Sequence, residues 1–232
     1  MKRLFLISLA LILAINISAA NSIAMISASK GKVNLRRAAK VVPHKTGDFL
    51  YNKDEIRTGG ESFAAYKYID GSSTVKIFSN SIVYITATKN EKILDKKIEL
   101  DKGSVFTNIK PNTGSFSVAT PTTVASVKGT AFFTKFDEFG QSTFIITEGE
   151  VELKILNKDT QSITAGNTAV VQANGSFQIH NSTQEELQEI EQAELESTQG
   201  KENKKMRIIN DLSVLKSDSE RHYRLLKDLE YE

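Results

Sequence analysis

Few side chains in this sequence have the types and spacing that catalysis or metal binding requires. The three histidines, His44, His180 and His222, are far apart, and none has a Glu or His at the spacing of a zinc site. The sequence contains no cysteine, which excludes a disulfide, a cysteine nucleophile and a cysteine metal site. Motifs for phosphate binding, dinucleotide binding and a serine nucleophile are also missing from it. We therefore predict no catalytic residue, no metal and no cofactor.

One pair of carboxylates could imitate the acid pair of a glycosidase. Glu148 and Glu150 flank Gly149, and we expect them to share a strand face. A glycosidase also needs a cleft and a set distance between its two carboxyl groups, which the sequence does not indicate. We interpret both as solvated side chains of a turn, and an enzyme acting on glycans is only the third functional hypothesis.

The elements that position these residues have the period of β-strands. Between residues 26 and 179, glycines separate short runs rich in Val, Ile, Thr, Phe and Tyr, which suit a pleated, half-buried surface. The apolar residues alternate with polar ones, and Asp70-Gly71 and Asn174-Gly175 are dipeptides typical of tight turns. This predicts an all-β domain over 27–180, either a sandwich or a β-solenoid resembling a β-roll. The strand faces expected inside are Val75 with Ile77, Val105 with Thr107 and Ile109, Phe144 with Ile146, and Val151 with Leu153 and Ile155.

The N-terminus has the order of a bacterial signal peptide. Lys2 and Arg3 precede an apolar stretch over 4–15, and small residues follow up to Ala20. We predict a signal peptide over 1–20 with cleavage after Ala20, and retention as a membrane anchor is the alternative. No later segment is apolar enough to span a membrane, so the rest is expected in the periplasm, on the cell surface or secreted.

The last part of the chain, 181–232, is charged and predicted to be helical. Ser182 and Glu185 have the spacing of a capping box, and Leu187, Ile190 and Leu195 form a thin apolar stripe after it. A second helix is predicted over 204–229, with an apolar seam that is polar in its middle. This tail could bind a partner helix or a second copy as a weak coiled coil, pack on the β domain, or stay solvated.

The charge of the chain does not suggest a nucleic-acid partner. The formal net charge is +2, and no dense basic run occurs in the β domain. The basic pairs Arg36-Arg37 and Lys96-Lys97 are isolated, and we interpret them as solvated side chains.

The β domain resembles the FecR domain family over about residues 28–175. The resemblance rests on an ordered series of motifs that begins at Gly31-Lys32-Val33 and continues through Asp54-Glu-Ile-Arg-Thr-Gly59, Asp70-Gly71-Ser72, Leu100-Asp-Lys-Gly103, Thr120-Pro121, Val127-Lys128-Gly129-Thr130, Glu148-Gly149-Glu150 and Ala165-Gly166. Lys128 stands where the family usually has Arg, Ser79 where it has Pro, and Asn167 where it has Glu. We expect the motif residues to be mainly structural, and they are Thr58, Gly59, Asp70, Gly71, Gly103, Thr120, Pro121, Lys128, Gly129, Thr130, Glu148, Gly149 and Gly166.

The resemblance implies two functions besides the glycan enzyme. FecR-type regulators combine a cytoplasmic segment that restrains a sigma factor, a membrane helix, and a periplasmic FecR domain that receives a signal from a transporter. Here the FecR-like region begins close to the predicted cleavage site, which leaves no room for the cytoplasmic segment. We therefore expect a non-catalytic binding or scaffold module of the cell envelope, which recognises a protein or a polymer. The alternative is a signal receiver that acts with a separate membrane regulator.

Overall fold

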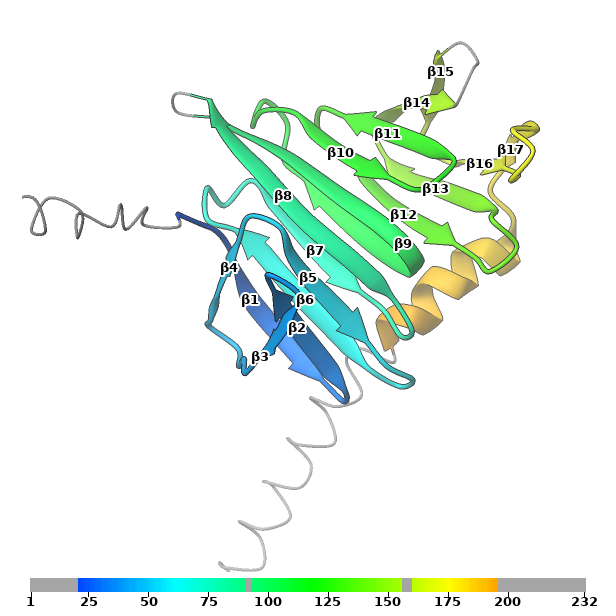
Figure 1. The fold of residues 1–232 in the computed structure, drawn as a ribbon. Coiled ribbons are helices and arrows are strands. Elements are labelled where there is room, and N and C mark those ends of the chain that lie inside the picture. Colours follow the sequence, from blue (N-terminus) through cyan, green and yellow to red (C-terminus); the bar gives the residue numbers. More distant parts are fainter. Residues whose placement is uncertain (1–20, 91–92, 156–159, 196–232) are drawn as a thin grey trace, which may run out of the picture.

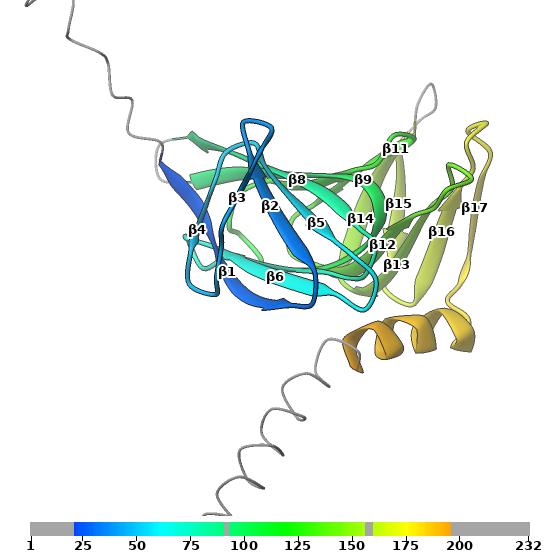
Figure 2. The same cartoon turned by 60° about the horizontal axis from the view of Figure 1, so that its bottom comes forward.

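The protein folds as two β-sheets packed face to face, and in the described residues one helix follows them (Figures 1 and 2). The computed structural model describes residues 21–90, 93–155 and 160–195. The predicted all-β class with a helical segment after it is confirmed. Of the two architectures that the sequence left open, the chain adopts a two-layered sandwich.

The first layer, which we call sheet A, contains only antiparallel neighbours. It lies below the other layer in Figure 2. In order across the sheet its strands are β4 (Phe49–Tyr51), β1 (Ser22–Lys30), β6 (Phe63–Tyr68), β7 (Ser73–Ile77), the second half of β9 (Ile93–Ile109), β12 (Ala131–Phe136), β13 (Ser142–Glu148), β16 (Asn167–Val171) and β17 (Phe177–Asn181).

The second layer, sheet B, is antiparallel except where β9 and β10 run side by side in the same direction. It faces the viewer in Figure 1. In order its strands are β3 (Lys40–Val42), β2 (Val33–Arg37), β5 (Asp54–Thr58), β8 (Ile82–Asn90), the first half of β9, β10 (Phe116–Ala119), β11 (Thr123–Val127), β14 (Glu150–Ile155) and β15 (Thr160–Thr164).

Strand β9 belongs to both sheets and changes layer near Gly103. Its residues up to Lys102 pair with β8 in sheet B, and those from Gly103 onward pair with β12 and β7 in sheet A. Gly103 has φ +88°, a conformation that L side chains rarely adopt. A Cβ atom at Gly103 would lie 2.2 Å from the Ser81 hydroxyl oxygen and 2.6 Å from the Ser81 Cα. Only glycine therefore lets the strand bend here while the loop at Ser81 packs against it.

The two inner faces form one continuous apolar core. Because side chains alternate along each strand, every second residue points between the sheets, and these positions are almost completely buried. The predicted inner faces are confirmed, including Thr107, which is fully buried between Val105 and Ile109. The largest fully buried aromatic side chains of this core are Tyr66, Tyr68, Phe116, Phe132 and Phe144.

The helix begins one residue later than the sequence predicted. Thr183, not Ser182, is its N-cap, because the Thr183 hydroxyl accepts a bond from the Glu186 backbone N–H at 3.3 Å. In return, the Glu186 carboxylate accepts the Thr183 backbone N–H at 2.8 Å, which completes a capping box. The Ser182–Glu185 prediction is therefore wrong by one position. Ser182 instead bonds to the turn before β16, where its N–H donates to the Gly166 carbonyl.

The helix over 184–195 packs on the outer face of sheet A (Figure 2). Ile190 is 8% exposed, whereas Leu187 and Leu195 are about half exposed. Ion pairs join Lys135 to Glu189, at 2.6 Å, and Lys76 to Glu194. Of the three readings of the tail, packing on the β domain therefore holds for this segment. The outer-face residues in the cluster with Ile190 are Ala28, Phe63, Ala65, Phe78, Phe106, Phe133 and Ile145.

Two predicted segments, the leader over 1–20 and the helix over 204–229, lie outside the described residues. In the described ranges, no helix combines the length and apolar character that crossing a membrane requires.

The bend in β9 yields a test of stability. We expect Gly103→Ala to lower the free energy of unfolding by about 3 kcal/mol, because it adds a clash to the cost of a left-handed Ala. The matched control is Gly71→Ala, since Gly71 has φ +66° but no atom within 4 Å of the position that a Cβ would take. That change should cost about 1 kcal/mol. Urea unfolding of the two variants measures the difference, and equal losses would contradict the role given to Ser81.

The helix contact yields a second test. Ile190→Asp should release the helix from sheet A, because it places a charge among Phe133, Ile145 and Ala65. Hydrogen exchange of 184–195 should then become fast while the sandwich strands stay protected. Leu187→Asp, on the same helix but 47% exposed, is the control and should leave exchange nearly unchanged. Equal effects of the two variants would show that Ile190 does not hold the helix.

Candidate functional site

The residues of the FecR-like motifs lie at the two rims of the sandwich, where the chain turns or crosses between layers. One end of the strands carries Thr58, Gly103 and Thr120, and we call it the Thr58 rim. The opposite end carries Asp70, Gly129 and Gly149, and we call it the Asp70 rim. Strand β12 runs from one rim to the other. It begins at Ala131, two residues after Gly129 at the Asp70 rim, and ends at Phe136, which lies opposite Gly103 at the Thr58 rim. The motif residues are therefore divided between two sites and do not converge on one cleft.

At the Thr58 rim, hydroxyl groups satisfy the backbone of neighbouring turns. The Thr58 hydroxyl donates to the Phe78 carbonyl at 2.5 Å and accepts the Ser81 N–H at 2.9 Å. Next to it, the Gly59 N–H donates to the Lys32 carbonyl at 2.8 Å. These bonds hold the ends of β5 and β2 against the turn before β8.

Thr120 plays the same role at the corner between β10 and β11. Its hydroxyl accepts the Thr123 N–H at 3.1 Å and lies 2.7 Å from the Ser142 hydroxyl, which belongs to sheet A. Pro121 follows it at the exposed tip of the corner. This corner therefore joins the two layers, with Thr120 as the buried connection.

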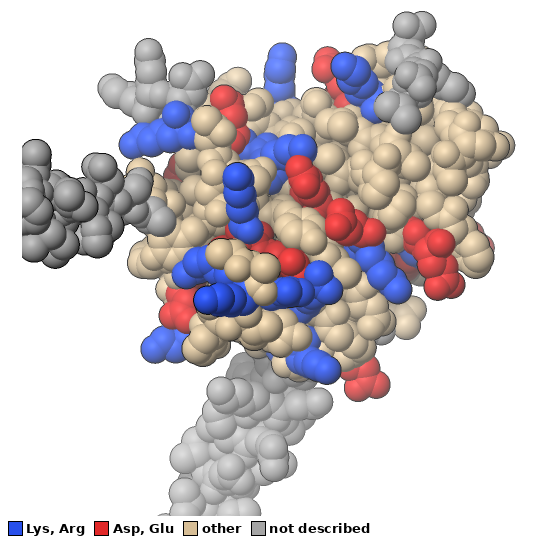
Figure 3. Space-filling model, viewed as in Figure 1, with Lys and Arg blue, Asp and Glu red and all other residues tan. Residues whose placement is uncertain are grey.

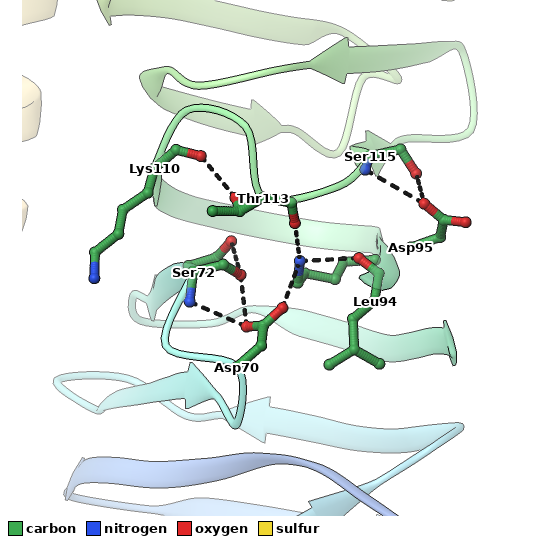
Figure 4. A network of polar contacts seen from close by, with 9 residues as sticks. Asp70, Ser72, Leu94, Asp95, Lys110, Thr113 and Ser115 are labelled. Carbon is green, nitrogen blue, oxygen red and sulfur yellow. Dashed lines mark hydrogen bonds and ion pairs between the residues drawn. The ribbon is translucent and has the colours of Figure 1, made fainter. Parts of the chain in front are cut away.

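At the Asp70 rim, an ion pair between the buried Lys96 and the partly exposed Asp70 joins the layers (Figure 4). The Lys96 ammonium lies 2.9 Å from an Asp70 carboxylate oxygen, and it donates at 2.9 Å to the carbonyl oxygens of Leu94 and Thr113. The Lys96 side chain is 1% exposed. Its three N–H donors are thus satisfied by groups from three different segments. The prediction of Lys96 as a solvated residue is wrong, because its position in β9 points inward.

The environment of Asp70 favours its charged form. Burial raises its pKa, but hydrogen bonds from Ser72 and Lys96 outweigh burial, and the pKa is lowered from the ordinary value of 3.8. The Ser72 hydroxyl donates to Asp70 at 2.6 Å and the Ser72 N–H at 3.0 Å. The Asp70-Gly71-Ser72 motif is therefore a turn whose carboxylate also receives a buried lysine.

The glycines of the Asp70 rim let the segments that pass between the two sheets pack closely against one another. A Cβ at Gly129 would lie 2.7 Å from the Pro111 Cα, and one at Gly149 would lie 2.6 Å from the Gly129 carbonyl oxygen. The Gly166 carbonyl accepts the Ser182 N–H and so joins the turn before β16 to the segment between β17 and the helix. Thr130 directly follows Gly129, and its buried hydroxyl has no hydrogen-bond partner among the described residues. Its carbonyl instead accepts the Ile109 N–H at 2.9 Å.

Glu148 and Glu150 do not share a strand face. Glu148 ends β13 in sheet A, and Glu150 begins β14 in sheet B, because Gly149, with φ +76°, takes the chain across the sandwich. Both side chains are exposed, and Glu150 bonds to Ser162. Lys128 is exposed as well.

Sequence reasoning also missed a second pair, in which the partly exposed Arg37 binds the buried Asp54. Both Asp54 oxygens accept bonds from the Arg37 guanidinium at 2.8 Å, and the Asp54 side chain is 0% exposed. The hydrogen bond to Asp54 raises the pKa of Arg37. Arg37 also lies over the Tyr51 ring, 4.2 Å from its centroid. The available signal in the sequence was Asp54 itself, an acid at the start of a strand-like motif. If such an acid is buried, it needs a cation nearby.

The outer face of sheet B, which the described helix does not cover, carries basic and acidic side chains mixed together (Figure 3). Arg36, Glu55, Tyr84 and Glu99 lie opposite one another on β2, β5, β8 and β9. Arg57 pairs with Glu55, Lys97 pairs with Glu99 at 2.6 Å, and Arg36 lies 3.9 Å from Glu55. We call these six residues the charged row.

The acidic residues of this face influence one another. Burial raises the pKa of Asp101, and the nearby charges of Glu99 and Glu55 raise it further, while Arg57 opposes the shift. The charged row is thus a mixed field in which neither sign dominates.

Beyond the charged row, β10 and β11 present small uncharged side chains. Ser117 and Ser126 lie opposite each other on these strands. Where they reach the Asp70 rim, a pocket of about 380 Å³ is present. It is lined by Ser115, Phe116, Ser117, Ser126, Val127, Lys128, Gly129, Glu150 and Glu152. This face therefore offers charged, hydroxyl and concave parts on one continuous surface.

No group of three His, Cys, Asp or Glu side chains is arranged to hold a metal ion in the part of the chain that the structure describes. The exposed charges and the pocket make the outer face of sheet B a candidate surface for interaction with another molecule.

The FecR protein family model matches residues 54–152, from β5 into β14. The resemblance inferred from the sequence is confirmed over this segment, and its extension to 28–53 and 153–175 stays a prediction. A search of curated proteins finds no match.

Two crystal structures of a "putative anti-sigma factor" from Parabacteroides distasonis, at 1.65 and 2.50 Å resolution, have a similar fold. In both comparisons the identity is 18% and the TM-score is 0.50, with 58% of this chain and 62% of that chain covered. The chain therefore spans about three fifths of the protein it resembles. At this identity the likeness concerns the fold alone.

The Asp70–Lys96 pair yields a test. Asp70→Asn should lower the free energy of unfolding by about 3 kcal/mol at pH 7, because it leaves a buried ammonium without a counter-charge. Since the pKa of Asp70 is lowered on folding, its contribution is complete above about pH 4 and is lost as the pH falls through the folded pKa. Unfolding curves between pH 2 and 7 measure both effects.

The matched control is the double variant Asp70→Asn/Lys96→Met, which removes both charges. It should regain much of the stability lost in the single variant. If the double variant is less stable than Asp70→Asn by the full effect of Lys96→Met alone, the two side chains are not coupled.

Proposed function

We propose that this chain is a non-catalytic, exported binding module of the bacterial cell envelope, which recognises a protein partner through the outer face of sheet B. The observation that carries the proposal is the difference between the two outer faces. The helix over 184–195 occupies part of sheet A, whereas the described helix leaves the charged row of sheet B open.

The composition of the charged row favours a protein over a polymer of one charge. Arg36 lies on β2, Glu55 and Arg57 lie on β5, and Lys97 and Glu99 lie on β9, so both signs are interspersed on either side of Tyr84 of β8. Interspersed charges complement the mixed charges of a protein surface. If the partner binds in a shifted position, like charges meet and repel each other. An anionic or cationic polymer would instead bind a face that carries the opposite charge throughout. Glu55 is nearly buried beneath Arg36 and Arg57, whereas both side chains of the Lys97–Glu99 pair are about half exposed, so a partner can exchange that pair at small desolvation cost.

The pocket next to the row supplies a place for a protruding side chain. It combines the Lys128 ammonium, the carboxylates of Glu150 and Glu152, and hydroxyls from Ser117 and Ser126. These groups offer both donors and acceptors to a polar side chain of the partner. Gly129 lines the pocket, and the backbone there packs closely against Pro111 and Gly149.

Export to the periplasm, the cell surface or the medium is part of the same proposal. It rests on the order of residues 1–20, in which a basic start, an apolar stretch and small residues precede the first strand.

Signal reception is the second candidate function. It is supported by the FecR match over 54–152 and by the fold shared with a protein described as an anti-sigma factor. In this version the partner of sheet B is a separately encoded membrane regulator or transporter, and binding transmits the state of the envelope. The surface is the same in both versions, and the identity of the partner separates them.

The experiment is affinity capture of the tagged full chain after crosslinking in the envelope of the bacterium that makes it. The captured partner is then titrated against Arg57→Glu and Lys97→Glu. We expect each reversal to weaken binding by about tenfold or more, since each places like charges across the interface. Lys67→Glu, on the exposed outer face of sheet A, makes the same charge change and should alter the affinity less than about twofold.

Several outcomes would overturn the proposal. It fails if Lys67→Glu weakens binding as much as the sheet B variants do, or if only a polymer is captured. A scaffold protein among the captured partners supports the binding module, and a membrane regulator or a transporter supports signal reception.

A further inference from the structure

In the described part of the chain, strand β17 forms one edge of sheet A. Its pairing with β16 on one side is antiparallel, with Ala169 opposite Ile179 and Val171 opposite Phe177. Two bonds fix which residues point toward β16: the Gln172 N–H donates to the Ser176 carbonyl, and the Ser182 N–H donates to the Gly166 carbonyl. In an antiparallel ladder such bonds recur at every second residue, so positions 178 and 180 also point toward β16.

The backbone groups of Phe177, Ile179 and Asn181 consequently point away from the sheet. Among the described residues, β17 pairs with β16 alone. These three residues therefore present a row of N–H and C=O groups that can receive another strand.

Edge strands usually carry features that prevent such pairing, and β17 has none of them. A charge, a proline or a bulge on the edge is the common protection. The sequence of β17 is Phe-Gln-Ile-His-Asn, and its register with β16 is regular throughout. The edge strand β3 of sheet B differs, because it carries Lys40 and follows two left-handed residues, Ala38 and Ala39.

The side chain at the centre of β17 is an exposed apolar group. Ile179 is 46% exposed although it lies on the same face as Ala169, which is fully buried in the core. Phe177, on the same side, is only partly buried against the core. The inner face of sheet A thus continues to its edge without a cover, and a further strand would bury Ile179.

We propose that a second copy of this chain occupies this edge, so that β17 pairs with β17 of the second copy in antiparallel orientation about a two-fold axis at Ile179. In this register Ile179 faces Ile179 of the second copy, and Phe177 faces Asn181. All the outward backbone groups of the three residues are then paired.

The strand favours its own copy for three reasons. A two-fold axis at Ile179 places Phe177 opposite Asn181 and Ile179 opposite Ile179, so each outward residue of one copy meets an outward residue of the other. It carries no Lys, Arg, Asp or Glu, so no like charges meet across the axis. The helix that follows at 184 runs back under sheet A and leaves the edge open (Figure 2).

The strand end is also fixed before association. The Glu186 carboxylate accepts the Thr168 hydroxyl at 2.8 Å and lies 3.0 Å from the His180 ring nitrogen, which joins the first turn of the helix to β16 and β17. A preordered edge loses little conformational entropy when it pairs. Because five residues bury much less than the roughly 1,600 Å² of a standard interface, the dimer should be weak and dependent on concentration. This inference concerns a surface other than sheet B and goes beyond the proposed function.

The absence of cysteine from the sequence allows a direct test with the full chain. In the proposed register, the two Cα atoms at position 179 lie about 5.5 Å apart, which is within the range that a disulfide spans. Ile179→Cys should therefore form a disulfide-linked dimer rapidly under mild oxidation. Val41→Cys, on edge β3 and 65% exposed in the parent chain, is the matched control and should form it at least about tenfold more slowly.

Sedimentation of the chain without a cysteine provides a second measurement. The parent chain should show a rise in mean mass toward the dimer as its concentration rises to about 1 mM, and Ile179→Lys should stay monomeric with an unchanged circular dichroism spectrum. The proposal is overturned if Ile179→Cys crosslinks no faster than Val41→Cys, if the parent chain stays monomeric, or if a dimer persists in Ile179→Lys. Since neither readout uses the partner of sheet B, its failure leaves the proposed function intact.

Discussion

The bend of β9 at Gly103 is the constraint on which the sandwich depends. One strand supplies neighbours to both sheets, with β8 and β10 on its first half and β7 and β12 on its second. This makes the two layers a single continuous structure, and it requires a residue without a side chain where the backbone passes Ser81. The apolar inner faces can then meet along the whole molecule, and burial of these faces is the main source of stability.

Around that bend, the polar groups of the rims act as connections between layers. Thr120 joins the β10–β11 corner to Ser142 in sheet A. Lys96 of sheet B forms an ion pair with Asp70, which lies in the β6–β7 turn of sheet A. Because these groups are used inside the fold, the surface available to other molecules lies on the outer faces and edges. One outer face holds the helix through Ile190, and the other holds the charged row, which gives the molecule two chemically different sides.

Much of the fold could be predicted from the sequence because alternation is a local property. Val151, Leu153 and Ile155 identify an inner face without any knowledge of what lies opposite. Pairing is not local, and this explains the errors. Lys96 looks solvated until β9 is placed between β8 and β10, and Glu148 appears to share a face with Glu150 until the chain is seen to cross at Gly149. The helix start was wrong by one residue because Ser182 and Thr183 are both good caps, and the bond from Ser182 to Gly166 decides between them.

We propose that the outer face of sheet B meets a partner in the envelope. Hydroxyl-radical footprinting of the protein in intact envelopes, compared with the purified protein, tests this contact. We expect reduced oxidation of Tyr84, which lies within the charged row, and unchanged oxidation of Met25, which is exposed near the edge of sheet A. Unchanged oxidation of Tyr84, or protection confined to Met25, would contradict it.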